Sequence, residues 1–257
     1  RHHMARKKPG SALMAHNRAA PTGGKVVIAY VHPTEVTIGF HESIISTLLF
    51  DVARERRLFN GGGRLNSYSS ANVSNSRNSI CNDFLDKWPD AEWLWMVDAD
   101  MVFAPDTLYR LLANADKTDA PIVGGLCYGV SDGELFPTLY GLDRNDERGV
   151  HTIRYDTFPK DAMFQVAATG AACLLIHRSA LAAMREKAFS KPYPFFQETE
   201  LNGDPVGEDV TFCFRAGKLG LPIWIDTAVQ IGHQKTFIAD HDRYIQQVGD
   251  PHVVRPG

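Results

Sequence analysis

The chain has 257 residues, of which 44% are hydrophobic and 22% charged, as expected for a globular protein of one α/β domain or two small ones. No apolar run approaches the roughly 20 residues of a membrane span, so we expect no membrane-spanning segment. The net charge of -3 is unevenly spread along the chain. Residues 1–25 contain basic side chains and no acidic ones, so the rest of the chain is more acidic than the total suggests. This distribution argues against a broad phosphate-binding surface for nucleic acid.

The cysteines indicate neither a zinc site nor a disulfide framework, because they are far apart and form no C-x-x-C pair. They are Cys81, Cys127, Cys173 and Cys213. We expect buried, reduced thiols and therefore a cytoplasmic protein. The opening Arg1-His2-His3-Met4 resembles the remnant of an affinity tag, and residues 1–24 are expected to form a disordered leader.

In chain order, the first half alternates strands and helices, which predicts a wound parallel sheet. Strands are expected at residues 25–31, 64–71, 93–97 and 121–128, and helices at 42–57, after Ser74, and at 105–113. The apolar stripe of the first helix comprises Ile44, Ile45, Leu48, Leu49 and Val52. The second half predicts antiparallel or edge strands, with a helix that starts at Gly207-Glu208-Asp209 and a last strand at 222–228.

The strand at 93–97 is apolar on both faces and is followed by Asp98 and Asp100. Side chains at i and i+2 share a side of an extended chain, so these two carboxylates can converge on one point. Ligands bind beyond the carboxyl ends of strands in open α/β sheets. The pair therefore suggests Mg²⁺ or Mn²⁺ shared with the phosphates of a nucleotide. The alternative is a plain strand end, although Pro105-Asp106 already provides the next helix start.

Two further segments suggest contacts with a nucleotide. His32, Pro33 and Thr34 follow the first strand, where a loop either touches a base or ribose or simply connects to the helix. Arg77 and Asn78 lie near a helix start, where a positive side chain is unfavourable to the helix. A diphosphate would relieve this charge, whereas a solvated surface arginine would need no ligand.

Four residues of the second half are candidates for a site. Gly170 lies among small residues that either leave room for a substrate or permit tight packing. Glu208 and Asp209 lie in a first helical turn, where acids suit the helix dipole even without a function. His233 lies just beyond the last strand and is a candidate imidazole ligand, although a lone histidine is more often structural.

In this order, the D-x-D, the G-E-D about 110 residues later and the late G-H resemble the GT-A glycosyltransferases, especially the family 2-like group. The resemblance covers about residues 25–235. It implies an α/β fold with a Rossmann-like mixed central sheet flanked by helices. It also implies one catalytic domain over residues 25–240, with a nucleotide-sugar-binding half (25–129), an acceptor half (130–240) and a tail at 241–257.

On the donor side, the resemblance implies a nucleotide sugar, UDP- or GDP-linked, and a Mn²⁺ or Mg²⁺ ion. Asp98 would contact the ribose or the metal, Asp100 would bind the metal directly, and His233 would be its late ligand. Arg77 would face the nucleotide or its diphosphate. The chain has His32-Pro33-Thr34-Glu35 where many members have Pro-x-Tyr-Asn, so its contacts with the base are the least supported.

On the acceptor side, the resemblance makes Asp209 the general base of an inverting reaction, with Glu208 and Gly170 near the acceptor or sugar. The acceptor would be a carbohydrate or another hydroxyl compound. The Gln-x-x-Arg-Trp motif of processive synthases is missing from the sequence, which favours single addition. The sequence leaves retention or inversion open.

Three other functions remain open at this point. The same chemistry on modified bases of phage DNA would suit the compact size and the basic leader, but the acidic body gives it no support. A nucleotidyltransferase would usually need a Gly-rich basic phosphate loop near its start, and residues 25–40 contain none. A non-catalytic nucleotide- or carbohydrate-binding protein would need no paired D-x-D and G-E-D.

Overall fold

The computed structural model describes residues 13–14, 26–54, 58–59, 64–68, 72–131, 133–145, 149–235 and 238–250. The expected leader, residues 1–24, lies outside these ranges apart from Leu13–Met14, and so do residues 251–257 of the expected tail. Among the residues described, no helix is long and apolar enough to cross a membrane.

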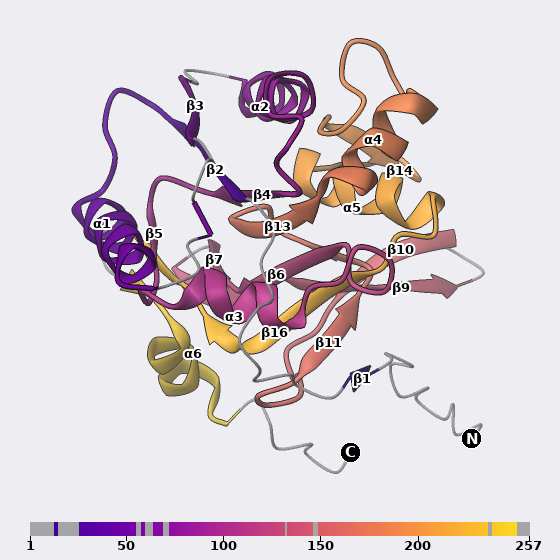
Figure 1. The fold of residues 1–257 in the computed structure, drawn as a ribbon. Helices are drawn as coiled ribbons and strands as arrows, with labels where there is room; N and C mark the ends of the chain where they lie inside the picture. Colours follow the sequence, from indigo (N-terminus) through magenta and orange to yellow (C-terminus); the bar gives the residue numbers. More distant parts are fainter. Residues whose placement is uncertain are drawn as a thin grey trace.

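The core of the fold is an eight-stranded mixed sheet with the order β1-β11-β16-β6-β13-β4-β2-β3 (Figure 1). In that order its strands are β1 (Leu13–Met14), β11 (Met163–Val166), β16 (Ile223–Gln230), β6 (Ile122–Leu126), β13 (Cys173–His177), β4 (Trp93–Val97), β2 (Val26–His32) and β3 (Arg64–Tyr68). β3, β2 and β4 are parallel, whereas β13 lies antiparallel between β4 and β6. The first-half alternation predicted neighbouring parallel strands, and β13 separates two of them.

Strand β4 lies within the sheet because both of its faces are apolar. Leu94 and Met96 join the hydrophobic core on one face, and Trp93, Trp95 and Val97 join the core on the other. This division follows from the alternation of side chains along a strand. Helices α2 (Val73–Lys87), α4 (Arg178–Lys187) and α5 (Glu208–Lys218) cover the first face, and α1 (Ile38–Val52) and α3 (Thr107–Asn114) cover the second (Figure 1).

Small sheets complete the second half of the chain. β9 (Leu139–Asn145) pairs with β10 (Gly149–Arg154) and β12 (Ala168–Thr169), while β7 (Tyr128–Ser131) pairs with β8 (Glu134–Pro137), and β14 (Thr199–Leu201) with β15 (Asp204–Val206). β17 (Gly232–Gln234) lies between β5 (Met101–Val102) and β18 (Ile238–Ala239). The β5–β17 pairing carries the end of the chain back to the D-x-D segment. Helix α6 (His241–Val248) follows, with Tyr244 buried.

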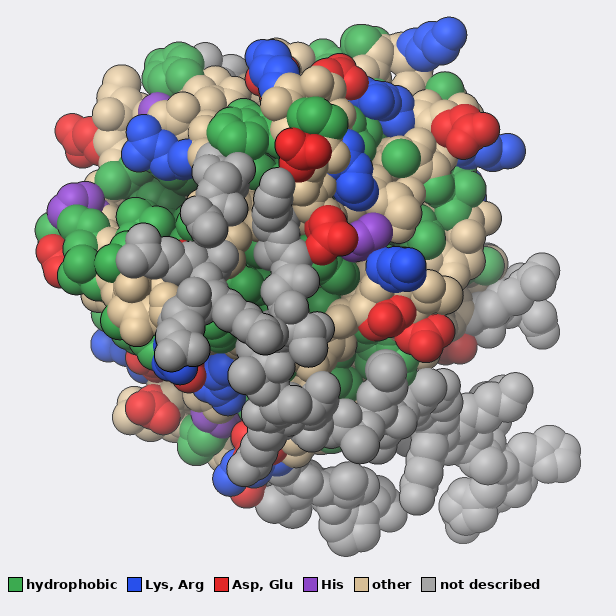
Figure 2. Space-filling model, viewed as in Figure 1, with side chains coloured by type: hydrophobic (Ala, Val, Ile, Leu, Met, Phe, Trp, Pro, Cys, Tyr) green, Lys and Arg blue, Asp and Glu red, His purple; other side chains and the backbone are tan. Residues whose placement is uncertain are grey.

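Helix α1 begins at Ile38 and ends at Val52, and it does not pack through the expected stripe. Ile44 packs against the core, but Leu49 is 65% and Val52 54% exposed. Figure 2 shows apolar side chains on the left of the molecule, where α1 lies. The buried face instead carries Phe40, Ser43, Thr47 and Asp51. Polar positions are buried there because neighbouring segments bond to them.

Asp51 shows why a polar face of α1 is buried. Its carboxylate accepts a hydrogen bond from the Leu58 N–H at 2.7 Å and another from the Tyr109 hydroxyl at 2.6 Å. A buried carboxylate with such donors is compensated for its lost hydration. These partners come from other segments, so the periodicity of the helix could not predict which face is buried.

Candidate active site

A cavity of about 580 Å³ lies beyond the carboxyl ends of β2 and β4, where ligands bind in open α/β sheets. Its lining comes from the loop after β2, the start of α2, the D-x-D segment and β17: Val31, His32, Pro33, Glu35, Val36, Thr37, Val73, Arg77, Asp98, Ala99, Asp100 and Gln234. A larger, mainly apolar cavity of about 820 Å³ lies along α5 and β14, and none of the expected site residues lines it. We therefore place the site at the smaller cavity, where the charges gather.

The D-x-D segment is held by neighbouring loops on both sides. The Thr37 N–H, in the loop that caps α1, donates to the Ala99 carbonyl at 3.1 Å. The Gln234 N–H, in β17, donates to the Asp100 carbonyl at 2.8 Å. The turn is thereby fixed between segments from early and late in the chain.

The carboxylates of Asp98 and Asp100 bond to different groups. The Met101 N–H donates to the Asp98 carbonyl at 3.1 Å, which closes a turn, so the two aspartates do not lie on an extended strand as expected. Asp98 Oδ1 accepts from Arg77 Nη2 at 2.7 Å. Asp100 Oδ2 lies 2.9 Å from His233 Nε2. The structure therefore brings Asp100 and His233 together and keeps Asp98 in another contact.

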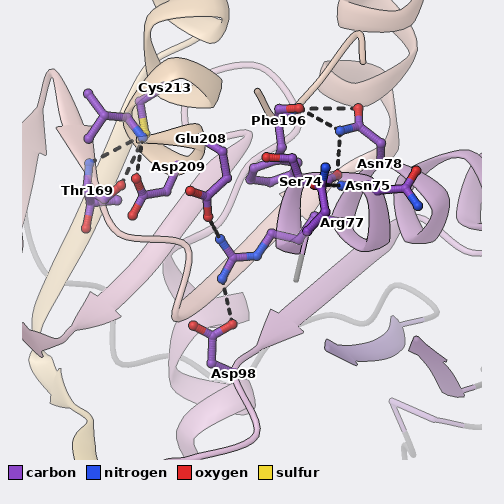
Figure 3. A network of polar contacts seen from close by, with 12 residues as sticks. Ser74, Asn75, Arg77, Asn78, Asp98, Thr169, Phe196, Glu208, Asp209 and Cys213 are labelled. Atoms are coloured by element: carbon purple, nitrogen blue, oxygen red, sulfur yellow. Dashed lines mark hydrogen bonds and ion pairs between the residues drawn. The ribbon is translucent and has the colours of Figure 1, made fainter. Parts of the chain in front are cut away.

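Arg77 joins the D-x-D segment to the G-E-D segment. It projects from α2, is 5% exposed, and donates to Asp98 and to Glu208 (Figure 3). Burial acts to lower the pKa of Arg77, but Asp98 and Glu208 outweigh it and raise that pKa, so the guanidinium is charged. The anions that Arg77 faces here are protein carboxylates. Helix α2 itself is capped by Asn72, two residues before Ser74.

Glu208 and Asp209 lie in the first turn of α5, directly after the N-cap Gly207. Burial raises the pKa of both carboxyl groups, and the positive charge of Arg77 opposes that rise. Asp209 also accepts a hydrogen bond from the Val210 N–H at 2.7 Å, which helps its charged form. The pKa of each of these neighbouring acids therefore lies above its ordinary value, which makes each a better proton acceptor.

Gly170 lies beside Asp209. A Cβ atom added at Gly170 would lie 3.5 Å from Asp209 Oδ2. The Thr169 N–H lies 3.5 Å from Cys213 Sγ, which ties β12 to α5 at this point (Figure 3). Burial, and then the charge of Asp209, raise the pKa of Tyr140 on β9. Gly170 and Thr169 thus lie next to α5 and outside the lining of the cavity.

His233 is oriented by the backbone of β7. Its Nδ1 lies 3.1 Å from the Tyr128 carbonyl oxygen, which can only accept, so Nδ1 carries a proton and Nε2 points to Asp100. Lys235 Nζ lies 2.7 Å from the same carboxylate oxygen. Burial acts to raise the pKa of Asp100, but the hydrogen bonds from His233 and Lys235 lower it overall.

The donor types at Asp100 and His233 fit Mn²⁺ or Mg²⁺ bound together with a nucleotide. In the described part of the chain, no three His, Cys, Asp or Glu side chains form a group that could hold a metal ion. A carboxylate and an imidazole whose Nδ1–H is held by a carbonyl are nevertheless a common ligand pair. Such ions often take one or two protein ligands and complete their shell with substrate phosphates and water.

Asn78, expected to contact a nucleotide, does not line the cavity. It is 3% exposed, and its Nδ2 donates to the Ser74 and Phe196 carbonyls, each at 2.7 Å (Figure 3). Its Oδ1 accepts from the Phe195 N–H at 3.0 Å. Because its amide bonds to backbone groups, Asn78 anchors the segment before β14 to α2.

The loop after β2 brings two of its three candidate residues to the cavity. His32 and Pro33 line the cavity, whereas Thr34 is exposed and does not line it. The ring of His32 lies 6.4 Å from that of Tyr68, edge to face, at the end of β3.

Thr37, Gln234 and Lys235 also contact the D-x-D segment, although no sequence pattern pointed to them. Lys235 follows His233 by two residues but lies just past the end of β17, so the alternation of a strand does not identify it. Thr37 is a typical helix N-cap residue. Nothing in the local sequence singles out Gln234.

Two solved structures share this fold. The protein A197 from STIV has a TM-score of 0.51 at 14% identity, with 82% of this chain and 86% of that chain covered. GalNAc-T7, in a structure with UDP, GalNAc and Mn²⁺, has a TM-score of 0.51 at 12% identity, with 82% of this chain covered. The match spans 44% of the GalNAc-T7 chain. Such low identities show the fold alone, and the fold is that of the GT-A glycosyltransferases.

The sequence comparison adds the family. Residues 82–183, which include the D-x-D segment, match the family model described as glycosyl transferase family 2. No curated protein matches the chain by sequence. The family match and the shared fold support a GT-A, family 2-like glycosyltransferase, which confirms the expected fold class and the expected class of enzyme.

Proposed function

We propose that the chain is a metal-dependent glycosyltransferase that adds a single sugar from a nucleotide-sugar donor to an acceptor hydroxyl. One observation carries this proposal: Arg77 connects Asp98, which lines the cavity, to Glu208, which is next to Asp209. Two acidic segments about 110 residues apart thereby meet at the carboxyl edge of one sheet. A transferase needs its donor and acceptor groups together in this way.

For the donor, we propose UDP- or GDP-linked sugars with Mn²⁺ or Mg²⁺. GalNAc-T7 has the same fold in a structure with UDP, GalNAc and Mn²⁺, which makes UDP and Mn²⁺ the first pair to test. His32 and Pro33 lie where the nucleoside would enter the cavity. Asp100 and His233 would hold the metal ion, which when bound would stabilise negative charge on the departing nucleoside diphosphate.

For the acceptor, we propose that Asp209 takes the proton of the attacking hydroxyl in an inverting reaction. Its burial raises its pKa towards the range in which a carboxylate accepts protons efficiently. Arg77 holds the neighbouring Glu208 in place, so that Glu208 can orient the acceptor. Gly170 leaves space beside Asp209 that a larger side chain would fill. If the reaction retains configuration, Asp209 positions the substrate instead.

The surface and the cysteines bear on the partner and the location. On the face in Figure 2, positive and negative side chains are interspersed, which suits a carbohydrate or other small hydroxyl compound better than DNA. All four cysteines are free and buried. This supports our proposal of a cytoplasmic protein.

Release of nucleoside diphosphate from a panel of donors, measured by chromatography, tests the proposed reaction. We expect Asp209→Asn to lower transfer by roughly 10²–10⁴-fold while donor affinity stays the same, because a base acts only in the chemical step. The surface variant Asp90→Asn is the matched control and should be unchanged. Transfer by Asp209→Asn at the native rate would rule out Asp209 as the base.

A further inference from the structure

Lys235 occupies a position beside Asp100 that a divalent cation would also use. Its Nζ lies 2.7 Å from Asp100 Oδ2, the same oxygen that lies 2.9 Å from His233 Nε2. The Lys235 side chain is 47% exposed and that of Asp100 28% exposed. The chain thus supplies its own cation to the carboxylate that we assign to the metal.

We propose that Lys235 competes with the divalent cation for Asp100, and that a nucleoside diphosphate relieves this competition by receiving the released ammonium group. The inference rests on the proposed nucleotide-sugar site and adds a residue that controls how the metal binds there. It makes metal binding and diphosphate binding mutually dependent.

The competition follows from charge. A doubly charged ion on Asp100 would lie within a few ångströms of the ammonium group, where like charges repel strongly. The two cations therefore exclude each other at this oxygen. Lysine can move away at low cost, because its ammonium is a point charge on a flexible four-carbon stem. Its exposure means that few packing contacts are lost.

The histidine, in contrast, stays in place. The contact of His233 Nδ1 with the Tyr128 carbonyl fixes its ring, and β17 fixes its backbone between β5 and β18. A metal ion would therefore keep His233 and displace Lys235. Gln234, the residue between them, lines the cavity, so the stem of Lys235 starts at the cavity edge. A diphosphate in the cavity would give the ammonium a new anionic partner.

This arrangement couples the two ligands. Without a diphosphate, the metal must break the Lys235–Asp100 ion pair and leave the ammonium in solvent. With a diphosphate, the ammonium exchanges one anion for another. If the diphosphate strengthens metal binding by a certain factor, linkage requires that the metal strengthen the binding of the diphosphate to the protein by the same factor.

Titration of Mn²⁺, with the free ion measured by electron paramagnetic resonance, tests this inference without an activity assay. We expect Lys235→Met to bind Mn²⁺ alone roughly two- to fivefold more tightly than the native protein, the range expected for a partly exposed ion pair. Addition of UDP should then strengthen Mn²⁺ binding less in Lys235→Met than in the native protein. Lys235→Arg keeps the charge and should restore native behaviour.

A matched control comes from an ion pair of the same kind elsewhere. Lys87 Nζ lies 2.8 Å from Asp83 Oδ1 on the surface of α2, so Lys87→Met should leave Mn²⁺ binding unchanged. Equal or weaker Mn²⁺ binding by Lys235→Met would overturn the inference and leave the metal-dependent function intact. Failure of every variant to bind Mn²⁺, even with UDP, would overturn both.

Discussion

Replacement of Arg77 with methionine would test whether this residue joins the two acidic segments. Methionine has a side chain of similar length but no guanidinium, so the change leaves the carboxylates of Asp98 and Glu208 without their buried cationic partner. Because Asp98 and Arg77 line the cavity, the substitution should reduce stability and donor binding together.

The size of the effect follows from burial. Removal of one partner of a buried ion pair typically costs about 3–5 kcal/mol. The side chain of Asp98 is 30% exposed and that of Glu208 15% exposed, so water can partly solvate each when Arg77 is lost. Arg77 Nε is also buried without a hydrogen bond, and its removal relieves a small cost. We therefore expect a loss of about 3 kcal/mol, which corresponds to a fall in melting temperature of roughly 6–12 °C for a chain of this size.

The loss should also depend on pH. The pKa of Glu208 is already raised by burial, and without Arg77 it would rise further. A raised carboxyl pKa in the folded state destabilises the protein above that pKa, and the penalty disappears below the unfolded value. The deficit of Arg77→Met should therefore be largest at neutral pH and shrink as the pH falls through the raised pKa.

Urea unfolding across this pH range, with Arg215→Met as the control, measures both effects. Arg215 is also buried, but it bonds to the carbonyls of Tyr193 and Phe195 and to Gln197. Its loss leaves no carboxylate without a partner, so its cost should vary little with pH. A loss of less than about 1 kcal/mol for Arg77→Met, or the same pH dependence in both variants, would refute this reasoning.

Substitutions at three positions test other parts of the site. Asp209→Asn should raise the melting temperature at pH 7, because burial raises the pKa of Asp209 and folding thus disfavours its charged form; a lower value at pH 7, or a gain that persists below the range where Asp209 titrates, would contradict this. Gly39→Ala would place a Cβ atom 2.5 Å from Gln234 Oε1 and 2.6 Å from Val102 Cγ2, so urea unfolding should show a loss of roughly 1–3 kcal/mol, and native stability would count against the packing at this turn. Gly170→Val should raise the KM for the acceptor without changing donor affinity, whereas Gly170→Ala, with only ordinary van der Waals contacts, should resemble the native enzyme; equal KM values for both variants would place the acceptor elsewhere.

The strongest local patterns predicted the elements that hold the site. The apolar runs at β2, β4 and β6 were placed correctly within a few residues, because strands buried on both faces leave a clear signal. The insertion of β13 between β4 and β6 depends on pairing across about 50–80 residues, which local periodicity does not contain.

Within the site, the sequence indicated the candidate residues more successfully than it indicated which groups they contact. Asp100 and His233 meet, but Asp98 turns towards Arg77 because a hydrogen-bonded turn interrupts the extended chain. Asn78 has a polar side chain in a site-like position, yet its bonds go to backbone groups of a segment that follows more than 100 residues later. Such partners are set by tertiary structure.

The central claim is that this cavity binds a nucleotide-sugar donor through a metal ion at Asp100. A thermal-shift screen of UDP-, GDP-, CMP- and dTDP-sugars, with and without Mn²⁺, tests it most directly, because a ligand that binds only the folded state raises its apparent stability. We expect one donor to raise the melting temperature of the native protein when Mn²⁺ is present, and Asp100→Ala to lose that metal-dependent rise. No shift with any donor, or the same metal-dependent shift in Asp100→Ala, would contradict the account.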